Sequence, residues 1–198
     1  MDLKLIYGNM RALCEAPQMM LHYADIPYEY KMVWDHYGSS WAEVKKDIIF
    51  NRLPILIINE DKYLWQSNTI IRYLSNLTKT KPSDEFQLAY CDAVFESTHE
   101  MFSPLNPTIN MTFGEKYNSN KKKLLEDILP NSLNNFEKLL QNSSGNFFIG
   151  NDPFYCDFNA YHHFSMCLIL DKNIFSNFPN LKKFINNFEK INNIKKYL

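Results

Sequence analysis

Three features that mark common protein classes are missing from this sequence. The first is net charge, because 21 basic side chains balance 22 acidic ones and the formal charge is −1 at pH 7. The two signs are spread along the chain, so no broad basic face is indicated for nucleic acid or for an anionic membrane. We therefore expect neither nucleic acid nor a membrane among the partners of this protein.

Paired cysteines and metal-ligand clusters are the second missing feature. The four cysteines, Cys14, Cys91, Cys156 and Cys167, show no CxxC or metal-finger spacing. Scattered cysteines of this kind are typical of buried or free thiols in a reducing compartment. Residues 162–163 are both histidine, but neighbours on a helix point in different directions and make a poor metal pair. We expect no metal site.

Long apolar runs are the third. The start of the chain, MDLKLIYGNM, lacks the apolar core of a signal peptide, and no run approaches the length that spans a bilayer. A cytoplasmic location is the resulting expectation.

The sequence does contain enough apolar residues for a hydrophobic core, because 45% of its residues are hydrophobic and 15% are aromatic. With 198 residues, it is expected to form one large domain or two small ones.

The stretch that begins at Phe50 organises the rest; it reads FNRLPILIINEDKYLWQSNTIIRYL. The unbroken apolar run Ile55–Ile58 has the length and β-branched composition of a buried strand. Residues 59–61 supply a turn, and Lys62–Trp65 can return as an antiparallel strand. Apolar residues then recur at helical spacing from Ile70, which predicts a helix capped by Ser67.

Upstream, the pattern predicts a βαβ unit. Leu3–Tyr7 is a short apolar strand that ends in a loop, and Tyr28–Val33 alternates as a second strand. Between them a helix is expected after Arg11, starting late because Pro17 is tolerated only in a first turn. A helical crossover makes the two strands parallel. A loop at residues 37–40 and a short helix over residues 41–49 lead into the central stretch.

This order, β-α-β-α-β-β-α, resembles the thioredoxin fold. Residues 78–84, TKTKPSD, are polar and are expected to form a linker between a domain at 1–77 and a domain at 85–198. The second domain shows apolar residues at three- and four-residue spacing and is predicted to be all helical. Its helices are expected over residues 86–101, 124–140, 156–170 and 181–191. The predicted fold class is α/β followed by all-α.

Two residues in the central stretch suggest ligand chemistry. Pro54 has no N–H, and a cis bond before it would leave the backbone groups of Leu53 free to pair with a peptide-like ligand. Ser67 at a helix start combines a hydroxyl, free N–H groups and the positive end of the helix dipole, which suits a carboxylate. Taken singly, each feature is better explained by a trans proline at a strand edge or by an ordinary cap.

Five N-terminal segments stand out in this order: YGNMR from Tyr7, DIPYEY from Asp25, SSWAEVK from Ser39, LPIL from Leu53 and WQSNTIIRYL from Trp65. Together they resemble cytosolic glutathione transferases, and the sigma class, which includes the glutathione-requiring prostaglandin D synthases, is the most similar. In the second half, IGNDPFYCDF from Ile149 is similar to the glycine turn and buried aspartate of the family. That resemblance implies that Asp157 bonds backbone amides and holds the helical domain together.

The resemblance implies a glutathione site on the N-terminal domain, with glutathione as co-substrate and no tightly bound cofactor. Tyr7 matches the catalytic tyrosine that holds the glutathione thiol as thiolate. Leu53 before Pro54 would pair with the cysteine unit as an added strand. The remaining matches bind the two ends of the tripeptide: Trp41, Lys45 and Arg52 at the glycine end, and Gln66 and Ser67 at the γ-glutamyl end.

The activity that the resemblance implies is conjugation of glutathione to small hydrophobic electrophiles, as in detoxification. The enzyme would be a homodimer whose helical domain contributes the hydrophobic substrate pocket. An alternative is a non-catalytic carrier of hydrophobic ligands or a protein-interaction module with the same fold. A third interpretation, thiol-disulfide exchange at Cys14, is less favoured because that residue lies seven positions beyond Tyr7.

The sequence departs from the family pattern at several positions. A family arginine near the sulfur is replaced by Leu13, which is expected to weaken stabilisation of the thiolate. Gly8 replaces an aromatic residue, and His99 stands where an acid reaches across the dimer interface in the family. Phe154 replaces the usual Ser or Thr cap, so that capping bond is lost or replaced. The tryptophan of the prostaglandin pocket is missing around residues 103–107, which argues against prostaglandin synthesis.

Overall fold

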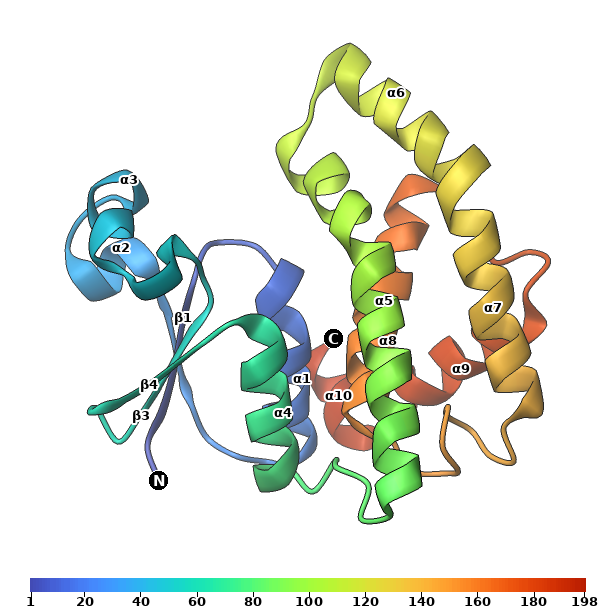
Figure 1. Ribbon diagram of the computed structural model, residues 1–198, viewed down its shortest axis with the longest axis horizontal. Helices are drawn as coiled ribbons and strands as arrows, with labels where there is room; N and C mark the ends of the chain where they lie inside the picture. Colours follow the sequence, from blue (N-terminus) through green and yellow to red (C-terminus); the bar gives the residue numbers. More distant parts are fainter. The chain divides into compact units, whose positions relative to one another are not determined.

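The computed structural model describes residues 1–198, and the chain divides into two compact units. Unit 1 comprises Met1–Lys81 together with Tyr197, and unit 2 comprises Pro82–Lys196 together with Leu198. Unit 1 contains the only sheet, whereas unit 2 is helical (Figure 1). No helix in either unit is long and apolar enough to cross a membrane.

The four strands of unit 1 form one mixed sheet. They are β1 (Leu3–Tyr7), β2 (Glu29–Met32), β3 (Ile55–Ile58) and β4 (Lys62–Trp65), in the order β2-β1-β3-β4. β1 and β2 are parallel, and the β1–β3 and β3–β4 pairs are antiparallel. The predicted βαβ unit and the predicted strand-turn-strand are both confirmed, and so is the thioredoxin-like fold class.

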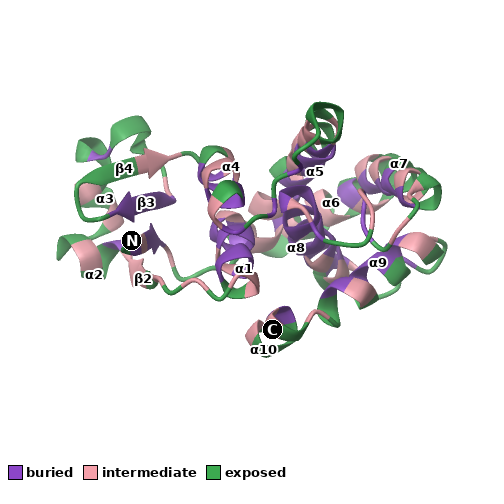
Figure 2. Ribbon diagram, turned by 90° about the horizontal axis from the view of Figure 1, so that it is seen from below, coloured by how far each residue is buried: buried purple, intermediate pink, exposed green.

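Helices cover the sheet unequally. α1 (Glu15–Tyr23) and α4 (Ser67–Leu77) pack side by side against one face (Figure 1). The opposite face carries a buried cluster that includes Ile6, Ile55 and Ile57, because alternate residues of a strand share a face. Figure 2 shows the result, with β3 buried along its whole length and the outer strand β4 only partly covered.

The segment between β2 and β3 differs from the prediction. It forms α2 (Val33–Tyr37), α3 (Trp41–Val44) and two short 3₁₀ turns, η2 (Lys45–Asp47) and η3 (Ile49–Asn51). The sequence predicted no helix at 33–37, and it predicted one continuous helix over 41–49. α2 ends at Gly38, which adopts the left-handed conformation that glycine tolerates, and the longer helix is interrupted at Ile48, whose backbone is extended.

Unit 2 is all helical, as predicted. Its elements are α5 (Glu85–Met111), α6 (Gly114–Lys123), the π-helical turn η4 (Leu124–Ile128), α7 (Leu129–Asn142), α8 (Tyr155–Leu170), α9 (Pro179–Glu189) and α10 (Asn192–Tyr197). α5 continues ten residues beyond the predicted end at Met101, through Pro104 and Pro107. Thr108 Oγ1 donates to the carbonyl of Pro104 at 2.9 Å, the bond that threonine commonly makes to the preceding helical turn.

Asp157 fixes the entry into α8, as the sequence predicted. Its fully buried carboxylate accepts from Phe148 N at 3.1 Å and from Phe154 N at 2.8 Å. Phe154 occupies the N-cap, where its side chain has no acceptor; its carbonyl instead accepts from Asp157 N at 2.9 Å. One half of a capping box is therefore kept and the other half is replaced by a backbone bond.

Candidate functional site

Strand register brings three of the predicted site segments to one end of the sheet in unit 1. Ile6 pairs with Ile55, and Ile55 pairs with Trp65, so these residues form one row across β1, β3 and β4. The strands of each pair run in opposite directions, so the next row outward holds Tyr7, Pro54 and Gln66. A phenol, the Leu-Pro bend and the start of α4 therefore lie at the same edge.

The hydroxyl oxygen of Tyr7 already accepts a hydrogen bond from within unit 1. The residue ends β1 and is only 7% exposed, and its Oη accepts from Leu13 N at 3.3 Å. Burial raises the pKa of Tyr7 to about 12, although the Leu13 N–H acts in the opposite direction. The phenol thus keeps its proton at neutral pH. Because the contact uses the backbone of Leu13, it does not depend on the arginine that this position has in the family.

The loop after Tyr7 is held by a residue that the sequence did not single out. Tyr30 in β2 donates its hydroxyl hydrogen to the carbonyl of Gly8 at 2.7 Å. β2 is parallel to β1, and Tyr7 pairs with Met32, two residues from Tyr30. The bond therefore ties the loop to the neighbouring strand. No sequence motif signals it, since it joins residues 22 positions apart.

A second anchor fixes the start of α1. Arg11 donates through Nε to Glu15 Oε1 at 2.8 Å, and its Nη2 forms an ion pair with the same carboxylate oxygen. Glu15 is 1% exposed, and an ionised carboxylate at such a position needs a partner. The helix begins late, as predicted, with the 3₁₀ turn η1 (Ala12–Cys14) before Glu15.

The Leu53–Pro54 bond is cis, as the sequence suggested. Leu53 is partly buried and Pro54 is fully buried. The ladder of β3 begins only at Ile55, so Leu53 is not part of the sheet pairing. Its position beside the open end of the sheet suits the strand-like pairing expected for a peptide ligand.

The start of α4 differs in one detail from the prediction. Gln66, not Ser67, is the N-cap. Its backbone has a positive φ of 69°, which residues other than glycine rarely adopt. Ser67 is the first helical residue and is 9% exposed. The prediction of Ser67 as the cap was wrong because Ser67 is already helical, whereas Gln66 has the non-helical backbone of an N-cap. Ser67 still lies in the first turn, where backbone N–H groups lack helical partners.

The three residues predicted for the glycine end are less closely assembled. Trp41 opens α3 and packs against the buried cluster of the sheet. Lys45 and Arg52 are exposed, and neither forms a salt bridge. The structure therefore leaves both cations open to an anionic partner, and it assigns Trp41 a packing role in addition to any contact with ligand.

Cys14 is unsuited to the thiol-disulfide chemistry considered from the sequence. Its side chain is completely buried, and burial strongly raises the pKa of its thiol, with the nearby Glu15 carboxylate adding to the effect. A reactive cysteine needs an exposed, stabilised thiolate. Buried Cys14 meets neither requirement.

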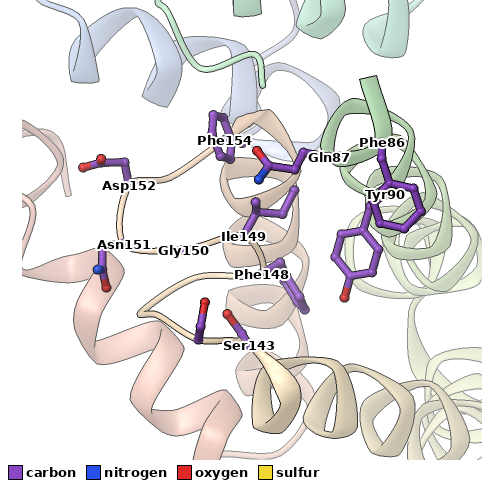
Figure 3. A pocket seen from close by; sticks show the side chains of 11 residues that line it. Phe86, Gln87, Tyr90, Ser143, Phe148, Ile149, Gly150, Asn151, Asp152 and Phe154 are labelled. Carbon is purple, nitrogen blue, oxygen red and sulfur yellow. The ribbon is translucent and has the colours of Figure 1, made fainter. Parts of the chain in front are cut away.

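A separate cavity of about 440 Å³ lies in unit 2, between the start of α5 and the loop over residues 143–154. In Figure 3 the side chains of Gln87 and Tyr90 lie opposite the part of the loop that carries Ile149 and Gly150. Its lining contains aromatic rings, amides, two serine hydroxyls and the carboxylate of Asp152, but no cysteine, histidine or lysine. The serines therefore have no histidine or lysine in the lining to act as their base.

Comparison with known proteins places both units in one family. Residues 1–76 match the family described as glutathione S-transferase, N-terminal domain, and residues 99–198 match that described as glutathione S-transferase, C-terminal domain. The Caenorhabditis elegans protein named glutathione S-transferase P is 29% identical over 202 residues, which cover 100% of this chain and 92% of the relative.

Solved structures agree with the sequence matches. The Pi-class glutathione S-transferase of Onchocerca volvulus has a TM-score of 0.87 at 26% identity, covering 100% of this chain and 92% of that chain. Rat hPGDS complexed with a quinoline has a TM-score of 0.87 at 25% identity, covering 100% of this chain and 96% of that chain. These proteins represent more than one class, so the comparisons support the family more firmly than the sigma class. The chain belongs to the glutathione S-transferase family.

Proposed function

We propose that this glutathione transferase ionises glutathione at Tyr7 and transfers the sulfur to small hydrophobic electrophiles. The observation that carries the proposal is the hydroxyl of Tyr7 at the open end of the sheet, with its oxygen already accepting from Leu13 N. A phenol oxygen that accepts one bond still has its single hydrogen to donate. Tyr7 therefore acts as a hydrogen-bond donor toward the glutathione sulfur.

The chemical need for such a donor is simple. A free thiol has a pKa near 8.5, so only a few per cent of it is thiolate at neutral pH, and the thiolate is the nucleophile. A hydrogen bond donated to the sulfur favours the anion, and each unit by which the thiol pKa falls is worth about 1.4 kcal/mol. The raised pKa of Tyr7, about 12, keeps the phenol protonated so that it donates rather than acting as a base. The thiol proton leaves to solvent.

The rest of the site would position the tripeptide. The backbone of Leu53 lies outside the sheet ladder and would pair with the cysteine unit. Gln66 and Ser67 would hold the γ-glutamyl carboxylate at the start of α4, where free N–H groups and the helix dipole favour negative charge. Trp41, Lys45 and Arg52 would hold the glycine end, with the two exposed cations facing its carboxylate.

Replacement of Tyr7 by phenylalanine tests the proposal directly. Wild type and Tyr7→Phe would be compared in a conjugation assay with a reactive aryl halide and in binding to immobilised glutathione. We expect retained binding and a large loss of turnover, together with loss of the thiolate absorbance in an ultraviolet difference spectrum of the glutathione complex. Equal turnover by the two proteins would remove Tyr7 from the mechanism. Binding of glutathione by wild type without measurable turnover would instead indicate a carrier.

We further propose that the protein is a cytoplasmic homodimer of the sigma type that acts in detoxification. The support is the order of the five N-terminal segments from Tyr7 to Leu74 and the family membership itself. Residues 78–84 would be the linker between the two domains, since α4 ends at Leu77 and α5 begins at Glu85. Sedimentation equilibrium tests the dimer, and a panel of electrophiles that includes a prostaglandin precursor tests the class.

A further inference from the structure

A hollow in unit 1, distinct from the cavity in unit 2, shares no residue with the proposed glutathione site. It is a cavity of about 380 Å³ between β4 and the segment over residues 37–49, and we call it the β4 pocket. Buried Ile48 and Ile55 belong to its lining, and both are members of the hydrophobic cluster on that face of the sheet. A cavity of this volume suits a small molecule. Its walls therefore decide which kind of molecule fits.

Aromatic rings form much of the wall. Tyr63 and Trp65 are two residues apart on β4 and so lie on the same face, and their rings are stacked with centroids 6.3 Å apart and planes inclined by 17°. Tyr37, at the end of α2, contributes a third ring. Tyr37 is 39% exposed and Tyr63 is 43% exposed, so a substantial part of both rings is left uncovered by the fold. Faces of such rings carry negative electrostatic potential.

The charged group in the lining of the β4 pocket is negative. Asp47 is exposed and forms no salt bridge, and the lining contains no lysine, arginine or histidine. Lys45 and Lys46 precede Asp47 in the sequence, but neither lines the cavity. A carboxylate beside several aromatic faces attracts a cation and disfavours an anion such as glutathione. The isoleucine side chains have no hydrogen-bonding groups, so they favour an apolar part of a ligand.

From these features we infer that the β4 pocket binds an organic monocation with an aromatic or apolar body, such as a quaternary ammonium compound or a hydrophobic amine. The cationic head would lie near Asp47 and over the faces of Tyr37, Tyr63 or Trp65. The apolar body would contact Ile48 and Ile55. Such binding is separate from thiol activation, because the two sites have no residue in common.

A pair of probes with the same shape tests the charge preference. The cation is 3-hydroxyphenyltrimethylammonium, and its neutral counterpart is 3-tert-butylphenol. Affinities would be measured by NMR titration of the full chain, following the indole N–H signal of Trp65, which is identified by its loss in Trp65→Phe. We expect the cation to bind about 10-fold more tightly than the neutral probe, and its affinity to fall as salt is added.

Substitution of the carboxylate separates this site from other surface binding. Asp47→Asn is expected to weaken binding of the cation about 5-fold and to leave the neutral probe unchanged. Asp61→Asn, an exposed acid in the β3–β4 turn outside the cavity, is the matched control and should change neither. Equal affinities for the two probes, or no response of the cation to Asp47→Asn, would overturn the inference.

The outcome is independent of the proposed enzymatic function. Tyr7→Phe should leave binding of the cation unchanged, and saturating glutathione should not displace it. Displacement by glutathione would show that the probe occupies the glutathione site, and would also overturn the inference. Failure of the conjugation assay alone would leave the β4 pocket untouched.

Discussion

The open edge of the sheet in unit 1 and the α5–α8 core of unit 2 use polar groups in opposite ways. At the sheet edge, the hydrogen of the Tyr7 phenol and the first turn of α4 are available to a ligand. In the core, Asn159 donates to Thr98 Oγ1 at 2.8 Å, and a ring nitrogen of His163 bonds the carbonyl of Thr98 at 2.9 Å. At the sheet edge these polar groups can still form hydrogen bonds with a ligand. In the core the corresponding groups bond each other and hold α5 and α8 together.

This difference indicates where substitutions should act. Polar groups that are bonded within a core stabilise one arrangement of helices, and their loss costs folding free energy. Polar groups that bond a ligand contribute little to the free energy of folding, so their removal is expected to lower ligand affinity or turnover rather than stability. The four predictions below test that separation, from the largest expected effect to the smallest.

Asp157→Ala should destabilise the protein by about 3 kcal/mol, because it leaves the N–H groups of Phe148 and Phe154 without their acceptor in a buried site. The measurement is the free energy of unfolding in urea. Asp152→Ala, an exposed acid in the same loop, is the control and should change stability by less than about 0.5 kcal/mol. Similar losses in both variants would show that Asp157 does not anchor α8.

Tyr7→Phe should lower kcat/KM for conjugation about 100-fold, which corresponds to about 2.7 kcal/mol of transition-state stabilisation. The reason is loss of the proposed hydrogen bond from the Tyr7 hydroxyl to the glutathione sulfur. Thermal stability should change little, since the variant removes one hydroxyl that accepts a single long bond. If unfolding were affected as strongly as turnover, the proposed separation between edge and core would fail.

The stability of unit 2 should fall in mild acid. Burial, with help from His162 and His99, holds the pKa of His163 well below its usual value, so the folded state keeps the ring neutral. The unfolded chain binds this proton below about pH 6.5, so the contribution of His163 is fully present above that pH and is lost as pH falls, by up to about 1.4 kcal/mol per pH unit. His163→Asn should show a shallower acid loss than wild type between pH 6.5 and 5.

Asp157 contributes to the same curve with the opposite sign. Burial raises the pKa of its carboxyl to about 7, against the two N–H donors that favour the anion. The folded pKa lies above the unfolded value of about 3.9, so this contribution is present at low pH and is lost as pH rises toward 7. Comparison of wild type with His163→Asn at each pH cancels this shared term. If stability fell with decreasing pH equally steeply in wild type and in His163→Asn, His163 would not be the cause of the loss of stability in acid.

Tyr30→Phe should reduce kcat about 5-fold, close to the net value of one hydrogen bond, because the loop after Tyr7 loses its bond through Gly8. Tyr28→Phe is the matched control, since the Tyr28 hydroxyl donates to Gln18 Oε1 at 3.1 Å and not to the loop. The KM for glutathione should change less than kcat in Tyr30→Phe. Equal effects of the two variants would assign Tyr30 a purely structural role.

The parts of the fold that local patterns could predict were those with short-range causes. β1, β3 and β4 have the predicted limits, because apolar alternation and turn residues act within a few positions. α2, and the 3₁₀ turns that replace the end of the helix predicted at 41–49, were missed. In that segment, packing of Val33 and Ile48 against the sheet determines the backbone more than local propensity does.

The predicted site residues divide in the same manner. Tyr7, Pro54 and Gln66 could be assigned to one site through the family resemblance, and the strand register of the structure places them in one row. The Leu13 N–H on Tyr7 and the Tyr30–Gly8 bond could not, since they depend on how a loop closes between distant residues. The sequence predicted Ser67 as the cap, but Gln66 holds that position, because the cap depends on backbone dihedrals that one residue type does not fix.

The sequence by itself determined the mixed sheet and the helical second unit, which follow from apolar periods of two and of about 3.6 residues. That Tyr7, the Leu53–Pro54 bend and the start of the next helix serve one site was implied by the family resemblance and not by periodicity. Only the tertiary structure decided what the Tyr7 oxygen accepts, which tyrosine holds the adjoining loop, and that three rings and one carboxylate surround a hollow beside β4. Such contacts join positions far apart in the chain, so packing sets them and local pattern does not.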